Sequence, residues 1–149
     1  MMLGTALALI VAFSVTVAEE AKKENAKVTC PVAGKEIKIA DAKVVSYRKS
    51  DVYVCCDGCK GKLEKDSAKY ATKANKQLVE TKQYKQVKCP LGGRAVNPKQ
   101  TVKVGGVEVG LCCGNCKKKA EGASGDDQIA LLFADKAFEK GFEKVEAKK

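Results

Sequence analysis

Valines alternate with other residues on both sides of Gly105-Gly106, which predicts a β-hairpin. We expect its strands at residues 101–104 and 107–112. Two glycines between alternating strands are typical of a two-residue primed turn, because that turn places both residues at positive φ. The pattern therefore predicts a tight turn at this hairpin.

A second hairpin is predicted earlier in the chain, with strands at residues 43–47 and 51–55. Here Arg48-Lys49 stands where the later hairpin has its two glycines. Residues with a side chain rarely adopt positive φ. We therefore expect a wider turn at this position.

Each hairpin is followed by a segment that predicts a helix. The first helix should begin near Asp57 or Gly58 and carry residues 60–70, with Leu63 as its main apolar contact. In the later segment Ala120 takes that place, and the glycine- and serine-rich stretch 122–125 interrupts the pattern. Downstream of it, apolar residues at helical spacing predict a helix from about 128 to 145. Its apolar stripe favours packing on the rest of the domain over an exposed face for a partner.

The chain reads as a tandem repeat built on its cysteines. Cys30-Pro31 and Cys89-Pro90 each open a motif Cys-Pro-x-x-Gly followed by a basic residue, and each motif precedes a Cys-Cys-x-x-Cys-Lys cluster. The first cysteine moves by 59 positions between copies (30 to 89) and the cluster by 57 (55 to 112). Chance placement would rarely put all eight cysteines on equivalent positions.

Composition removes several functional classes. The chain has 149 residues, a net charge of +10 and no histidine, so imidazole catalysis and imidazole metal sites are excluded. Arg48 and Arg94 are the only arginines among 28 basic residues, and aromatic residues make up 5%. Specific recognition of nucleic acids depends on arginine forks and aromatic platforms, so we expect none. We also find no pattern of residues that predicts an enzyme.

The N-terminus predicts export. Leu3 to Val17 is an apolar run, and Thr16-Val17-Ala18 offers small residues for a signal peptidase. Cleavage after Ala18 would leave no stable membrane span and a periplasmic or extracellular protein. No Lys or Arg precedes the run, so a retained anchor is the alternative, although the run is short for a full span.

The cysteines are the candidate functional residues, and two chemistries are open to them. A module of about 50 residues with one hairpin and one short helix buries too little apolar surface to be stable alone, so a cross-link is expected. Thiolates can close a metal site, which contributes on the order of 10 kcal/mol to folding. An exported chain with an even number of cysteines can instead form disulfides, each contributing about 2–4 kcal/mol.

The spacing favours a metal, because it places one thiolate on a turn and the others at a hairpin end and a helix start. Neighbouring cysteines on a strand point to opposite faces, so three or four sulfurs can ligate in each copy. Three sulfurs would leave an open position suited to a soft ion such as Cu⁺. The candidate ligands are Cys30, Cys55, Cys56, Cys59, Cys89, Cys112, Cys113 and Cys116.

These motifs resemble the YHS/TRASH-like domains, a treble-clef-type group associated with heavy-metal trafficking, resistance and sensing. The resemblance covers roughly residues 28–70 and 87–119 and extends to exported bacterial proteins that carry such modules. It implies a Cys-x-x-x-Cys pair, mapped onto Cys55 with Cys59 and onto Cys112 with Cys116, partnered by Cys30 and Cys89. This chain departs from the family in lacking the Tyr-His-Ser signature and the aromatic residue on the helix.

We therefore expect an α+β protein of two small treble-clef-like ββα modules, with an additional C-terminal helix and an N-terminal signal segment. The expected boundaries are a signal peptide at 1–18, a flexible tail at 19–27, the first module at 28–80, a linker at 81–86, the second module at 87–125 and the C-terminal helix at 126–149. The expected function is non-enzymatic metal binding, with Zn²⁺ first and Cu⁺ or another soft heavy metal as the alternative. A partner in the cell envelope would bind through the C-terminal helix. The competing hypothesis is a disulfide-stapled or thiol-redox protein that uses the two C-x-x-C pairs.

Overall fold

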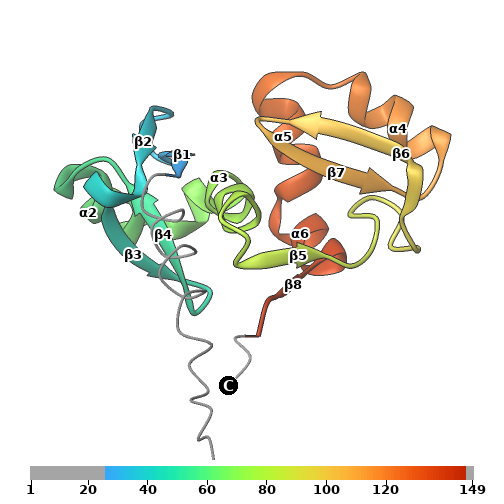
Figure 1. Ribbon diagram of the computed structural model, residues 1–149. Helices are drawn as coiled ribbons and strands as arrows, with labels where there is room; N and C mark the ends of the chain where they lie inside the picture. Colours follow the sequence, from blue (N-terminus) through green and yellow to red (C-terminus); the bar gives the residue numbers. More distant parts are fainter. Residues whose placement is uncertain (1–25, 147–149) are drawn as a thin grey trace, which may run out of the picture.

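The computed structural model describes residues 26–146, and we restrict the account to them. The predicted signal segment and most of the predicted tail lie outside the described residues. The described chain forms two lobes, with one helix, α3 (Ser67–Glu80), between them (Figure 1). We call residues 27–65 the first lobe and residues 87–121 the second lobe.

The first lobe consists of two antiparallel hairpins and a helix, and its second hairpin is the one predicted at residues 43–55. Val28 pairs with Ile37 in the first hairpin, which the sequence pattern did not indicate. The helix begins at Asp57, as predicted, and Leu63 is buried on it. It ends at Lys65 and does not run to residue 70 as predicted, because Asp66 caps the separate helix α3. In chain order the elements are β1 (Lys27–Thr29), β2 (Glu36–Lys38), η1 (Ile39–Asp41), β3 (Lys43–Tyr47), β4 (Ser50–Val54) and α2 (Asp57–Lys65).

The second lobe has the same order of hairpin, paired cysteines and helix. Its hairpin turns at Gly105 and Gly106, both at positive φ, so the predicted tight turn is confirmed. The predicted linker 81–86 contains a short strand that pairs with a strand near the C-terminus. The remaining elements are β5 (Tyr84–Gln86), β6 (Asn97–Val104), β7 (Val107–Leu111), α4 (Gly114–Glu121), α5 (Gly125–Phe133), α6 (Asp135–Gly141) and β8 (Phe142–Lys144). The described chain is thus α+β, with small hairpins and five α-helices.

The expectation of a wide turn in the first of the two equivalent hairpins was wrong. Tyr47 pairs directly with Ser50, so Arg48 and Lys49 form a two-residue turn with φ of 51° and 57°. Contacts with distant residues stabilise this conformation: Tyr84 Oη donates a hydrogen bond to the Arg48 carbonyl at 3.3 Å, and Lys144 Nζ donates one to the Lys49 carbonyl. Tertiary contacts offset the local backbone cost here.

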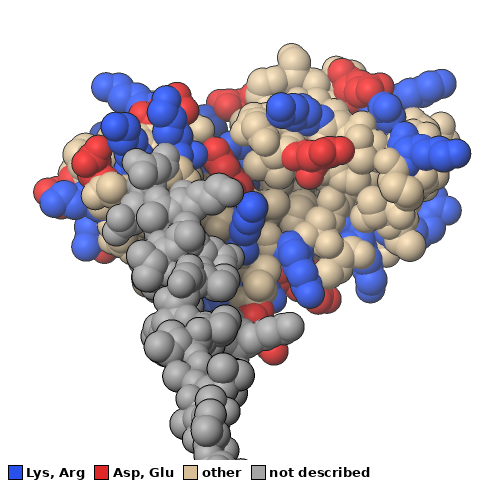
Figure 2. All heavy atoms as spheres, in the orientation of Figure 1, with Lys and Arg blue, Asp and Glu red and all other residues tan. Residues whose placement is uncertain are grey.

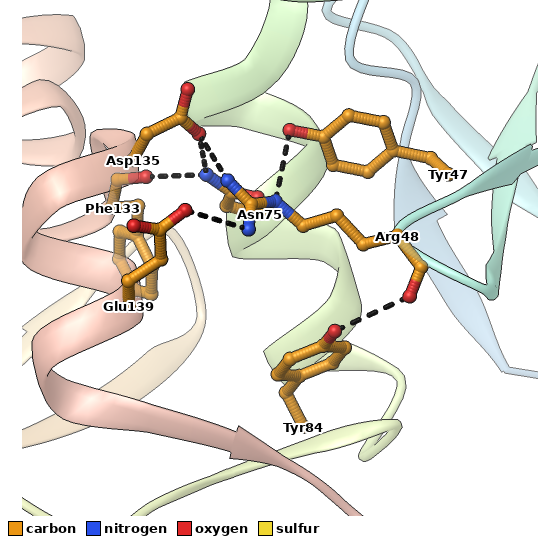
Figure 3. A network of polar contacts seen from close by, with 7 residues as sticks. All are labelled: Tyr47, Arg48, Asn75, Tyr84, Phe133, Asp135 and Glu139. Carbon is orange, nitrogen blue, oxygen red and sulfur yellow. Dashed lines mark hydrogen bonds and ion pairs between the residues drawn. The ribbon is translucent and has the colours of Figure 1, made fainter.

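The Arg48 side chain ties this turn to α6 (Figure 3). Its guanidinium donates to Asp135 at 2.8 Å and to Glu139 at 3.1 Å. Asn75 of α3 donates to the same Asp135 carboxylate at 2.9 Å. The first lobe, α3 and the C-terminal region therefore share one polar network.

The single C-terminal helix predicted over 128–145 is corrected to two helices and a strand. The helix is interrupted at Ala134, where the backbone is extended at φ −57° and ψ 151°. Asn75 Nδ2 donates to the Phe133 carbonyl at 3.0 Å and so satisfies an acceptor that a continuous helix would have used internally. The bend also directs Asp135 toward Arg48.

One apolar core runs through both lobes. It joins Val52 and Leu63 of the first lobe to Val109 of the second, with Phe133 and Phe138 from the C-terminal helices. On the face of the molecule shown in Figure 2, Lys and Arg side chains are spread over both lobes, with Asp and Glu side chains among them. The helices between residues 26 and 146 are all too short or too polar to cross a bilayer.

Candidate metal centres

The structure brings six of the eight cysteines together in two triplets. The sulfurs of Cys30, Cys55 and Cys59 all lie within 4.8 Å of one another, and so do those of Cys89, Cys112 and Cys116. Each triplet combines the lone turn cysteine with two from its own cluster. The predicted convergence within each half of the chain is confirmed for these six residues, and either triplet can hold a metal ion.

The turn cysteine is held by the same backbone motif in both lobes. Cys30 N donates to the Lys35 carbonyl at 2.8 Å, and Gly34 N donates to the Cys30 carbonyl at 2.9 Å. The equivalent bonds of Cys89, to Arg94 and from Gly93, measure 2.9 and 2.7 Å. Gly34 and Gly93 have φ of 69° and 67°, a conformation that glycine adopts without strain, which explains the glycine of the motif.

The remaining ligands sit where a strand meets a helix. Cys55 directly follows β4 and Cys59 lies in the first turn of α2, and their sulfurs are 3.5 Å apart. The sulfurs of Cys112 and Cys116 are 3.7 Å apart. Two thiolates on one tetrahedral zinc ion, each about 2.3 Å from the metal, lie about 3.8 Å apart. Both pairs therefore have nearly the separation that a shared ion requires.

None of the eight cysteines, all of which lie in the described part of the chain, is disulfide-bonded. A disulfide requires about 2.05 Å between sulfurs. The hydrogen-bonded cysteine pairs instead have sulfurs 3.5 to 3.9 Å apart.

Backbone N–H groups prepare the turn cysteines to ionise. Burial acts to raise the pKa of Cys30, but neighbouring backbone N–H groups outweigh it and lower that pKa, Ala33 foremost with its nitrogen 3.5 Å from the sulfur. Cys89 has its pKa lowered in the same way, chiefly by the Gly92 N–H at 3.3 Å. Both turns therefore favour thiolate, the form that binds metal.

The helix cysteines behave in the opposite way. Burial and the neighbouring sulfurs raise the pKa of Cys59 to about 12. The pKa of Cys116 is raised to about 12 by the same two causes. Like charges in one small site resist ionising together. A bound cation would remove this repulsion, so binding should release the protons of these thiols.

Cys56 and Cys113 stand outside the two triplets. Their sulfurs lie 3.8 Å from Cys55 and 3.9 Å from Cys112, respectively. Each residue is the N-cap of its helix, and nearby backbone N–H groups lower its pKa, to about 7 for Cys113. That these two cysteines also ligate stays a prediction.

Two glutamines that the sequence reasoning missed connect the turns to the hairpins. Gln77 Nε2 donates to the Thr29 and Tyr53 carbonyls at 2.9 and 2.7 Å, and its Oε1 accepts from Tyr53 N at 2.7 Å. Thr29 precedes Cys30, and Tyr53 stands two residues before Cys55. Gln77 therefore fixes the first turn beside the strand that leads to the other ligands.

Gln86 does the same in the second lobe. Its Nε2 donates to the Lys88 and Gly110 carbonyls at 3.0 and 2.6 Å, and its Oε1 accepts from Gly110 N at 2.8 Å. Gln86 comes from β5 and Gln77 from α3, so no repeat in the sequence relates them. That is why comparing the two copies could not find them.

Comparison of the chain with protein-family models, curated proteins and solved structures finds no match. The assignment of the two triplets as candidate metal centres therefore rests on their geometry.

Proposed function

We propose that this is an exported, non-enzymatic protein that binds two soft metal ions, one in each lobe, for buffering or delivery. The single observation that carries the proposal is the convergence of Cys30, Cys55 and Cys59 within 4.8 Å, repeated by their equivalents in the second lobe. Thiolate-only sites select Zn²⁺, Cu⁺ and related ions over hard cations. An ion with three protein ligands has one coordination position open, and another ligand can bind there to deliver or remove the ion.

Two further parts of the proposal rest on the sequence. Export rests on the apolar run from Leu3 to Val17, and a role with heavy metals is supported by the resemblance to YHS/TRASH-like domains. Thiolates bind both Zn²⁺ and Cu⁺. We propose Zn²⁺ first, with Cu⁺ as the alternative.

Metal content of the reduced full chain tests the proposal. We expect native mass spectrometry to show two bound ions per chain after loading with Zn²⁺ or Cu⁺. Cys30→Ser and Cys89→Ser should each retain one ion, and each variant serves as the control for the other. Metal-edge absorption should show at least three sulfur ligands per ion, so two sulfurs would refute the proposed sites.

Denaturing alkylation separates this function from the disulfide or redox alternative. Eight alkylatable thiols together with bound metal support metal binding. A mass deficit of about 2 Da per bridge, without metal in protein taken from its own compartment, would support disulfides instead.

A further inference from the structure

The two turn motifs differ at three positions, and two of these differences alter the surroundings of the sulfurs. Gly92 stands where the first site has Ala33, and Arg94 stands where it has Lys35. Both differences lie inside the motif that presents the turn cysteine. They change what surrounds the ion, since the three ligands themselves are equivalent.

Gly92 lets the sulfurs of the second site lie directly against the turn. A Cβ built on Gly92 would stand 2.7 Å from Cys112 Sγ, 3.7 Å from Cys116 Sγ and 3.8 Å from Cys89 Sγ. The first contact is too short for any residue but glycine without a shift of the sulfur. The first site carries the methyl group of Ala33 at this position.

Arg94 places a cation beside both Cys112 and the outer cysteine Cys113 of the second site. Its Nη2 donates to Cys113 Sγ at 3.8 Å, and within residues 26–146 it makes no ion pair with a carboxylate. Within residues 26–146 no lysine or arginine donates a hydrogen bond to the Cys56 sulfur, which lies 3.8 Å from that of Cys55. Cys113 is also partly buried, whereas Cys56 is exposed.

The contact between Arg94 and Cys113 affects how many thiolates a metal ion in the second site can bind, because each added thiolate adds a negative charge. A divalent ion with three thiolates carries one net negative charge, and with four it carries two. A guanidinium beside the fourth sulfur offsets that second charge and stabilises the thiolate. The second site alone is therefore equipped to add an outer sulfur to its ion.

The second turn also contacts the end of α6. Gly141 at the end of α6 accepts hydrogen bonds from Val87 N at 2.8 Å and Lys88 N at 3.1 Å, and a Cβ on Gly141 would lie 3.0 Å from Pro90. This close backbone contact packs α6 against the turn.

A groove lies beside the first turn. It has a volume of about 360 Å³ and runs along Pro31 and Val32, between α3 and α5, and Tyr70 and Ile129 also line it. The groove reaches Pro31, the residue next to Cys30, and none of the three cysteines of the first triplet lines it.

We infer that the second site is a closed site of four sulfurs, with Cys113 held by Arg94 as its fourth ligand, and that the first is an open site of three sulfurs that exchanges its ion. On binding, the Cys113 side chain turns toward the metal and its thiol proton passes to solvent. Cys56 remains outside the first site. This inference rests on the proposed function, and it divides that function into one retained and one exchangeable ion.

Cadmium NMR on the full chain loaded with two ¹¹³Cd²⁺ ions tests the ligand count without a mutation, because the cadmium chemical shift depends on the number of bound thiolates. We expect two resonances, one from a four-sulfur and one from a three-sulfur environment. Cys113→Ser should move the four-sulfur resonance alone, and Cys56→Ser should move neither. Two identical environments, or equal effects of the two substitutions, would overturn the inference.

Metal release to an excess of chelator tests the exchange. We expect metal to be released in two phases, the faster from the first site and the slower from the second. The faster phase should be missing in Cys30→Ser and the slower in Cys89→Ser. Arg94→Gln should weaken binding at the second site alone by about 10–100-fold, as loss of a group that supports a metal ligand does. Its matched control, Lys35→Gln, should change neither phase, and circular dichroism checks that each variant is folded.

The outcomes separate this inference from the proposed function. If the reduced wild-type chain binds no cadmium, the proposed function fails. If it binds two ions that show one phase of release and one sulfur count, metal binding stands and the division between the sites is wrong.

Discussion

Gln77 and Gln86 make the same three backbone hydrogen bonds in the two lobes, although one lies on a helix and the other on a strand. Each amide joins the residue before the turn cysteine to the strand that leads to the next two ligands. A metal site assembled from distant parts of the chain depends on such supports, because misplaced ligands weaken binding.

Removal of the Gln77 amide should destabilise the protein. Gln77 is 1% exposed, so Gln77→Ala would leave two buried backbone groups of Tyr53 and the partly buried Thr29 carbonyl without partners. We expect a loss of about 3 kcal/mol in the free energy of unfolding, measured by urea denaturation. Gln86→Ala is the matched comparison and should cost about 1 kcal/mol, because water can reach its more exposed partners. Equal losses would show that burial does not set the effect.

Much of this architecture could be predicted from the sequence where the signal is local. The glycine turn at 105–106, the start of α2 at Asp57 and the convergence of the turn cysteines followed from spacing alone. The tight turn at Arg48-Lys49 and the break at Ala134 could not be predicted, because Tyr84, Asn75 and Lys144 stabilise them from far along the chain. The hydrogen bonds of Gln77 and Gln86 could not be predicted for the same reason.

Arg48 should prove important for the junction of the first lobe with α6. Arg48→Ala removes the bonds to Asp135 and Glu139, and we expect it to lower stability by about 1 kcal/mol, since both carboxylates are at least half exposed. Arg48→Gly also removes those bonds but relieves the positive φ of 51°. It should therefore be less destabilising than the alanine variant, by thermal denaturation. A glycine variant as unstable as the alanine one would contradict the strain at this turn.

The same junction should weaken in acid. Burial acts to raise the pKa of Asp135, but hydrogen bonds from Asn75 and Arg48 outweigh it and lower that pKa. The ionised form therefore adds stability above about pH 4, the unfolded pKa, and this contribution disappears as the pH falls through the lower folded value. Asp135→Asn should be less stable than wild type near pH 6, and the difference should shrink below pH 4. A difference independent of pH would place its origin elsewhere.

Gly92 should be required by the second site and not by the fold. Gly92→Ala would bring a methyl group within 2.7 Å of Cys112 Sγ, and the sulfur must move. Crowding of this kind costs about 1–3 kcal/mol, so we expect a loss of affinity of about 5- to 150-fold at this site. Ala33→Gly in the first lobe is the control and should leave affinity there nearly unchanged. Competition with a chelator measures both, and unchanged affinity in Gly92→Ala would contradict the close approach.

Metal removal should lower stability without abolishing the fold. Small metal sites often supply most of the folding free energy of an isolated module. Here the two lobes share one apolar core that includes Phe133, Phe138 and Phe142 from outside either lobe. We therefore expect the reduced, chelated protein to keep its helices, with a lower Tm by circular dichroism than the loaded protein, and zinc should restore the Tm. Complete loss of helical signal on chelation would show that the shared core is too weak to hold the lobes without metal.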